Sequence, residues 1–97
     1  MLRRTRYRTF YRTVDGHADY EFELVRLARG GWRVYVLTAP NYGARDSGAV
    51  VTHRLRDVGG RTYICWSGEL RSLNDALRIA ARWADATQAY VAYGVRF

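Results

Sequence analysis

The sequence is poor in several residue types. It contains one cysteine, one proline and no lysine, and none of its hydrophobic runs is long enough to cross a membrane. A single cysteine, Cys65, cannot form a disulfide within the chain, which excludes a disulfide-stabilised secreted fold and favours a reducing, cytoplasmic location. A membrane-spanning helix needs about 20 apolar residues in a row, and the arginine-rich start of the chain is not followed by the apolar run of a secretory signal. We therefore expect no membrane partner.

Arginine supplies all of the positive side-chain charge. The chain has 16 arginines against nine acidic residues, and its formal net charge is +7. We attribute the complete replacement of lysine by arginine to the codon bias of a high-GC genome. A basic surface attracts nucleic-acid phosphates, acidic proteins or anionic lipid. The charge therefore indicates classes of partner and no particular one.

The length and the hydrophobic content together predict one domain over residues 1–97. A chain of 97 residues is near the common size of a single domain, and 48% hydrophobic residues are enough to bury one core. Alternation and glycine-containing turns predict strands over 2–14, 20–28, 32–38, 50–56 and 61–66. Residues 39–49, which hold the only proline, are predicted to form a long loop.

One long amphipathic helix is predicted from Ser72 to Gly94. Ser72 is a good N-cap residue, Asp75 places a carboxylate in the first turn, and Gly94 can close the helix in a left-handed conformation. The residues expected on the buried face recur at spacings of three and four: Leu73, Ala76, Leu77, Ala80, Trp83, Ala84, Thr87, Tyr90 and Val91. The predicted fold class is α+β, an antiparallel meander of about five strands with this helix packed across one face.

Two-residue turns at Asp15-Gly16, Gly30-Gly31 and Gly59-Gly60 are predicted to set the register of three hairpins. That register pairs Leu55 with Ile64 and places Leu24 on the open face. The residues that it places under the helix are Val25, Leu27, Trp32, Val34, Val36, Val51, His53, Leu55, Ile64 and Trp66. It places a mixture of arginine and tyrosine on the open face, which we predict to be the binding site: Arg26, Arg33, Tyr35, Arg54, Arg56, Arg61 and Tyr63. Such a face can contact phosphates and stack on bases, but the same residue types dominate protein interfaces.

No catalytic, metal or cofactor site is predicted. Cys65 and His53 are candidates for a nucleophile and its base, but the assumed register places them on opposite faces of one hairpin. Two histidines and one cysteine lack the spacing of metal ligands, and no phosphate-binding glycine motif is present.

The first strand is the other candidate for phosphate contact, because residues 1–14 carry five arginines and no acid. The first hairpin, however, places Arg12 across from Asp19 and Arg8 across from Glu23. These residues are therefore predicted to form cross-strand ion pairs, with a phosphate-binding arm as the alternative.

Residues 61–84, RTYICWSGELRSLNDALRIAARWA, resemble the closing half of AP2-type and integrase N-terminal DNA-binding domains. In that family, a strand that ends near an aromatic residue leads through a glycine turn and a Ser or Thr cap into an alanine-rich helix. The resemblance implies a helix that backs an antiparallel sheet whose open face enters the DNA major groove. The whole chain is also similar to small uncharacterised proteins of phages and mobile elements of high-GC bacteria.

The leading hypothesis is a non-enzymatic module that binds nucleic acid, DNA in particular, through the arginine and tyrosine face. The alternative is a protein-binding module, such as an inhibitor or adaptor, that docks on an acidic or nucleic-acid-binding protein. Because one helix leaves the other face of the sheet open, a homodimer is a further possibility.

Overall fold

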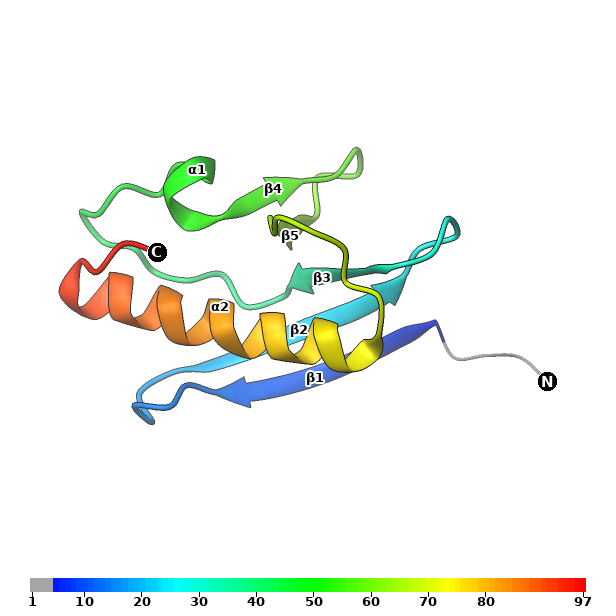
Figure 1. Ribbon diagram of the computed structural model, residues 1–97. Helices are drawn as coiled ribbons and strands as arrows, with labels where there is room; N and C mark the ends of the chain where they lie inside the picture. The colour runs from blue at the N-terminus through cyan, green and yellow to red at the C-terminus, as the bar shows by residue number, and fades with distance from the viewer. Residues whose placement is uncertain (1–4) are drawn as a thin grey trace.

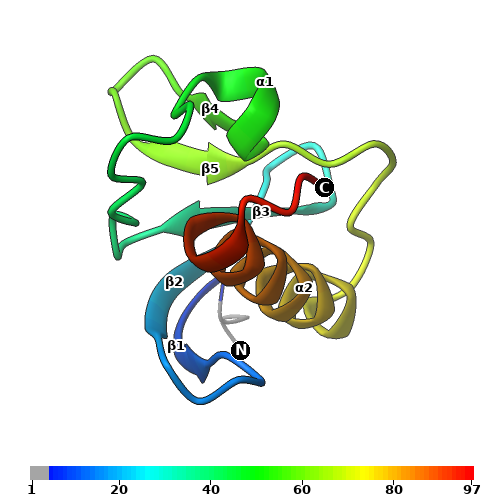
Figure 2. The same ribbon diagram turned by 90° about the vertical axis from the view of Figure 1, so that its left-hand side faces the viewer.

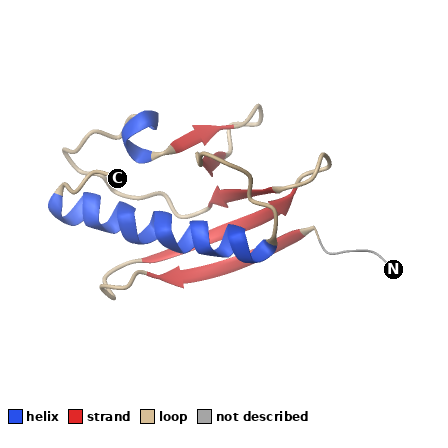
Figure 3. Ribbon diagram, in the orientation of Figure 1, coloured by secondary structure: helices blue, strands red, loops and turns tan. Residues whose placement is uncertain are grey.

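The structure is a computed structural model that describes residues 5–97, and these residues form an antiparallel sheet with a long helix across one face (Figures 1 and 3). The strands are β1 (Arg6–Arg12), β2 (Asp19–Arg26), β3 (Trp32–Val36), β4 (Arg54–Arg56) and β5 (Thr62–Ile64). The helices are α1 (Ala49–Thr52) and α2 (Leu73–Tyr93). The predicted α+β fold of five strands and one long C-terminal helix is confirmed. Residues 2–4 of the predicted first strand lie outside the described residues.

The order of the strands in the sheet is β1-β2-β3-β5-β4, so the last two strands are exchanged relative to a simple meander. β5 pairs with β3 at the single position Tyr35↔Tyr63, and β4 forms the far edge. The exchange is possible because residues 37–53 cross over to the outer side before β4 begins. β5 then returns beside β3 through a tight hairpin.

Helix α2 begins and ends where the capping residues predict. The Ser72 hydroxyl accepts a hydrogen bond from the Asp75 N–H at 3.1 Å, and Gly94 adopts a left-handed φ of 74° while its N–H donates to the Tyr90 carbonyl. The buried positions of the helix are Ala76, Ala80, Trp83, Ala84, Thr87 and Tyr90. All of them belong to the face that the spacing predicts, but Leu77, which was also predicted on this face, is 37% exposed.

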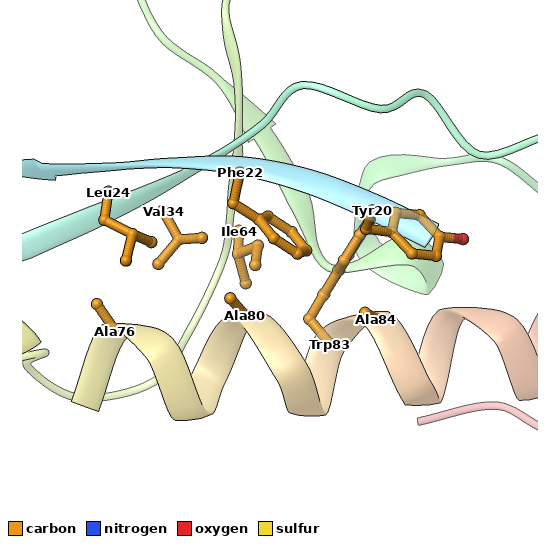
Figure 4. Close-up of a cluster of buried hydrophobic side chains, with 9 residues drawn as sticks. All are labelled: Tyr20, Phe22, Leu24, Val34, Ile64, Ala76, Ala80, Trp83 and Ala84. Carbon is orange, nitrogen blue, oxygen red and sulfur yellow. The ribbon is translucent and has the colours of Figure 1, made fainter. Parts of the chain in front are cut away.

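The core lies between α2 and the covered face of the sheet (Figure 4). Small alanines on α2 let the helix approach the sheet closely, and Trp83 fills the remaining space. Its ring packs edge-on against Tyr20 and Phe22, at 5.7 and 6.1 Å between centroids. The Trp83 indole N–H also donates to the Thr52 carbonyl at 3.0 Å. Trp83 therefore joins the helix to the middle of the sheet and to the end of α1.

The register of the first hairpin is the predicted one, with Arg8 opposite Glu23 and Arg12 opposite Asp19. The second and third hairpins differ from the prediction, because their registers are shifted by three residues and by one residue respectively. Their loops contain three residues, closed by pairing of Leu27 with Gly31 and of Asp57 with Arg61. Gly30 and Gly60 end these loops with φ of 92° and 82°, the left-handed conformation that a three-residue hairpin loop requires.

A shift by an odd number of residues changes the faces of the paired strands, because side chains alternate along a strand. Leu24 pairs with Val34 under the helix, whereas the prediction placed Leu24 on the open face. Arg54 pairs with Ile64 and Leu55 with Tyr63, whereas the prediction paired Leu55 with Ile64. The prediction for β3 is confirmed: Trp32, Val34 and Val36 lie on the helix side, and Arg33 and Tyr35 lie on the open face.

The predicted strand over 50–56 is partly wrong. Its first half forms α1, and only Arg54–Arg56 is extended. His53 lies between the two in a left-handed conformation with φ of 52°. The loop predicted over 39–49 is present up to Gly48, and the side chain of Tyr42 within it is buried.

Candidate functional site

The seven residues of the predicted site do not share one face. Arg33, Tyr35, Arg61 and Tyr63 lie together on the open face. Arg26, Arg54 and Arg56 lie on the opposite face, because each pairs across the strands with a residue of the helix side: Trp32, Ile64 and Thr62 respectively. Their predicted position on the open face is wrong, because the registers of the second and third hairpins differ from the predicted ones.

The four residues on the open face form an Arg–Tyr cluster of stacked side chains. The guanidinium carbon of Arg33 lies 4.1 Å from the centre of the Tyr63 ring, and that of Arg61 lies 4.0 Å from the centre of the Tyr35 ring. The two rings meet edge-on at 6.1 Å. Tyr35 is only 7% exposed, and its hydroxyl donates to Asp57 at 2.9 Å. Tyr35 therefore supports the face and cannot itself stack on a base.

Carboxylates neutralise most of the arginines on the open face. Glu23 accepts from Arg61 at 2.7 Å and from Arg6 at 3.1 Å. Arg12 pairs with Asp19 at 2.9 Å as predicted, whereas Arg8 reaches diagonally to Glu21 at 3.4 Å and not to Glu23. The described arginines of residues 1–14 are thus held in ion pairs, and Arg3 and Arg4 lie outside the described residues.

Glu23 and Asp57 are two carboxyl groups of the open face whose pKa values are lowered. The hydrogen bond from Arg61 lowers the pKa of Glu23, and the positive charges of Arg61 and Arg6 act in the same direction. Hydrogen bonds from the Arg61 backbone N–H and the Tyr35 hydroxyl lower the pKa of Asp57. Both carboxylates therefore stabilise the folded protein in their charged form.

Replacing Glu23 with glutamine tests this network. We expect E23Q to lower the free energy of unfolding by about 1 kcal/mol at pH 7, because two arginines lose their charged acceptor. The pKa of Glu23 is lower in the folded state than its unfolded value of about 4.3. The stabilisation is therefore present above the unfolded pKa and is lost as the pH falls through the folded pKa.

The difference between wild type and E23Q in urea denaturation should accordingly shrink below about pH 4. Glu69→Gln is the matched control, because the Glu69–Arg71 pair is 3.4 Å long and both side chains are largely exposed. A difference for E23Q that stays constant down to pH 3, or one no larger than that of E69Q, would contradict the role of Glu23.

The other two predicted arginines of the hairpin, Arg54 and Arg56, line a pocket beside β4. The β4 pocket has a volume of about 260 Å³ and is lined by Ser47, Ala49, Arg54, Leu55, Arg56 and Thr62. No carboxylate is among these lining residues, which all belong to the described part of the chain. Two guanidinium groups and two hydroxyl groups are the side chains that bind an anion such as phosphate.

The guanidinium of Arg54 is held in a fixed position. Its Nε donates to the Thr52 hydroxyl at 3.0 Å, and its Nη2 donates to the Ser47 carbonyl at 3.2 Å. Its flat face lies 4.8 Å from the centre of the Tyr42 ring. Arg56 is exposed at the edge strand. The pocket therefore combines one ordered arginine with one that can move toward a ligand.

Sequence reasoning did not identify Ser47 or Thr62 as part of this site. Ser47 comes from the loop before α1, and Thr62 comes from β5, and only the observed register brings them beside Arg54 and Arg56. The sequence itself carries no signal for this contact. Trp66, which the predicted register places in the core under the helix, is 41% exposed.

The predicted separation of His53 and Cys65 is wrong. They are cross-strand neighbours, since the Cys65 N–H donates to the His53 carbonyl at 2.8 Å, and both line a cavity of about 130 Å³. The His53 ring stacks on Phe97 at 4.6 Å, and its Nε2 lies 2.5 Å from the Phe97 carbonyl oxygen. The imidazole is therefore engaged with the C-terminal segment, and it has no hydrogen bond with Cys65.

Comparisons with protein-family models, with curated proteins and with solved structures found no match to this chain. Neither helix among residues 5–97 is both long and apolar enough to cross a membrane. Within the same residues, no three His, Cys, Asp or Glu side chains are grouped so that they could hold a metal ion. The function must therefore be argued from the surfaces described above.

Proposed function

We propose that the protein is a non-enzymatic module that binds nucleic acid, DNA in particular, and that it holds backbone phosphate in the β4 pocket. The observation that carries the proposal is the lining of this pocket: two arginines and two hydroxyl groups, without a carboxylate among its described residues. Phosphate oxygens accept hydrogen bonds from such groups, and these contacts supply most of the affinity of non-specific binding.

The distribution of the other arginines supports the same proposal. Six of the fourteen described arginines lie within 4.0 Å of a carboxylate. The remaining eight have no such partner among residues 5–97: Arg26, Arg29, Arg33, Arg45, Arg54, Arg56, Arg82 and Arg96. Their charge is free to interact with phosphates.

This proposal moves the contact away from the centre of the open face. Arg61 is paired with Glu23, and Tyr35 donates a hydrogen bond to Asp57. The open face therefore carries nearly equal numbers of positive and negative charges. Arg54 and Arg56 have no such acidic partner. The weak resemblance of residues 61–84 to DNA-binding domains that read the major groove with an open sheet face agrees with the ligand class but not with the surface used.

The salt dependence of binding tests the proposal. Fluorescence anisotropy with a labelled duplex of arbitrary sequence should show binding at about 50 mM salt that weakens steeply toward 200 mM. The double variant R54A/R56A should bind more weakly and should reduce the slope of log K against log salt by about 2, because about 1 is lost with each phosphate contact.

The control is R71A/R78A, which removes the same charge from two exposed arginines that are already ion-paired. The single variant R56A is a check on folding, because the Arg56 side chain is exposed at the edge strand and its removal should leave the fold intact. Equal loss in both double variants would move the contact elsewhere, and absence of duplex and single-strand binding at low salt would reject nucleic acid.

Docking of a protein on the open face is the second candidate function. Two apolar side chains of the open face favour it, because Phe10 is 72% exposed and Leu55 is 43% exposed. The charged groups around them are nearly balanced. Interfaces of this kind combine an apolar centre with arginine and tyrosine. Loss of partner binding on Phe10→Ser, with nucleic-acid binding unchanged, would assign the open face to a protein.

A further inference from the structure

The segment between β5 and α2 bows away from the sheet (Figure 2), and residues of this segment and of β3 line an opening between them. The two sides of the opening meet at the Tyr35↔Tyr63 pair and again where the Trp32 N–H donates to the Leu70 carbonyl at 2.8 Å. Between these contacts β3 contributes only residues 33–34, whereas the other side contributes residues 64–69. The longer side cannot lie flat against the shorter one, so the sheet is open at this point.

Aromatic side chains line the opening, which we call the connector slot. Its volume is about 200 Å³, and its lining includes Trp32, Tyr63, Trp66, Arg29 and Arg33. Trp66 is 41% exposed, an unusual position for the largest apolar side chain in a connecting segment. The slot therefore combines aromatic rings with cationic side chains, and the guanidinium carbon of Arg82 lies 5.2 Å from the centre of the Trp66 ring.

The charged groups at the slot are mainly cationic. The guanidinium of Arg33 lies flat on Tyr63, and neither Arg33 nor Arg29 has a carboxylate within ion-pair distance among the described residues. Glu69 lines an adjoining cavity of about 230 Å³, where it pairs with Arg71 at 3.4 Å. The aromatic lining favours a ligand with a flat ring, and the arginines favour a ligand with an anionic group.

We infer that the connector slot accepts one unstacked base of single-stranded nucleic acid, with the adjacent phosphate on Arg29. The inference rests on the proposed function and adds the form of nucleic acid to it. Single-strand binding proteins combine aromatic rings, on which bases stack, with arginines that contact the backbone. A base within a duplex is stacked between its neighbours and cannot enter such a slot unless it is flipped out.

Tryptophan fluorescence and anisotropy with an oligothymidylate and with a duplex of equal length test this inference. Addition of the single strand should quench tryptophan emission, because stacking brings a base onto Trp66, whereas the third tryptophan, Trp83, is buried in the core. The single strand should bind more tightly than the duplex at the same salt concentration.

Trp66→Leu should lower the affinity for the single strand about tenfold, since it keeps an apolar side chain but removes the stacking surface. Its affinity for the duplex should not change. Arg29→Ala should weaken single-strand binding more than Arg71→Ala, its neighbour in the same region whose guanidinium is paired with Glu69. Arg29 lies in an exposed turn, so this variant should retain the fold.

Equal affinity for single strand and duplex, or unchanged single-strand binding by W66L, would overturn the role of the slot and leave the β4 pocket in place. Absence of binding to both forms at low salt would overturn the proposed function as well. A dimeric solution mass that becomes monomeric in W66L would assign the slot to a second copy of the chain and would also overturn the inference.

Discussion

Replacing Trp83 with alanine is expected to lower the free energy of unfolding by about 3–5 kcal/mol. The side chain is 3% exposed and packs against Tyr20 and Phe22, so its removal leaves a large cavity between helix and sheet. The alanines around it on α2 are too small to fill this space. Urea denaturation followed by circular dichroism measures the loss, which is a large part of the stability of a domain of this size.

A control on the same helix separates the cavity from other effects. Leu77 is 37% exposed, and Leu77→Ala should cost about 1 kcal/mol or less, because little apolar surface leaves the core. Trp83→Phe should fall between the two, since it keeps a ring but leaves the Thr52 carbonyl without the indole N–H. A loss for W83A no larger than that for L77A would contradict the central position of Trp83.

The position of Trp83 could be predicted from the sequence because helix signals are local. Apolar residues at spacings of three and four define one face, and Ser72 and Gly94 mark the two ends through their own backbone preferences. None of this depends on contacts with distant residues. The helix was therefore predicted with its correct ends and, apart from the exposed Leu77, with its correct buried face.

The faces of the strands depend on the length of each turn, and the sequence signals for that length are weaker. A glycine pair is compatible with a two-residue turn and also with a three-residue loop whose last residue is left-handed. At the third hairpin the side chain of Asp57 accepts from the backbone N–H groups of Gly59 and Arg61, which stabilises the longer loop. The aspartate before the glycine pair is the signal that favours this loop.

The candidate site was predicted in part for the same reason. The residue types were chosen from arginine and tyrosine content, and four of the seven residues do lie together. The prediction did not include Glu23, Asp57, Ser47 or Thr62, whose places follow from register and from the path of the loop before α1. These polar partners decide which arginines are neutralised and which remain able to contact a ligand.

Thr52 links the fold to the β4 pocket, and its replacement by valine is the second large effect that we expect. The side chain is fully buried; its hydroxyl donates to the Gly48 carbonyl at 2.8 Å and accepts from Arg54 Nε at 3.0 Å. Valine has nearly the same shape and is also β-branched, so T52V removes these hydrogen bonds without opening a cavity. The expected loss is about 2 kcal/mol, because one of the bonds has a charged donor.

The same change should affect binding, because Arg54 then loses the acceptor that holds its guanidinium in place. We expect T52V to weaken nucleic-acid binding at a temperature at which the variant is still fully folded, and Thr52→Ser to preserve binding because it retains the hydroxyl. The coupling between Thr52 and Arg54 can be measured by a double-mutant cycle with T52V, R54A and the double variant.

In that cycle the loss of stability in the double variant should differ by about 1 kcal/mol from the sum of the two single losses. This is the size expected of a hydrogen bond with a charged donor and a neutral acceptor. Additive losses would show that Thr52 acts only through Gly48 and the end of α1. Unchanged binding by T52V would likewise mean that the position of Arg54 does not depend on Thr52. A coupling free energy together with weaker binding would establish that a buried threonine, which contacts no ligand, orients the arginine of the β4 pocket.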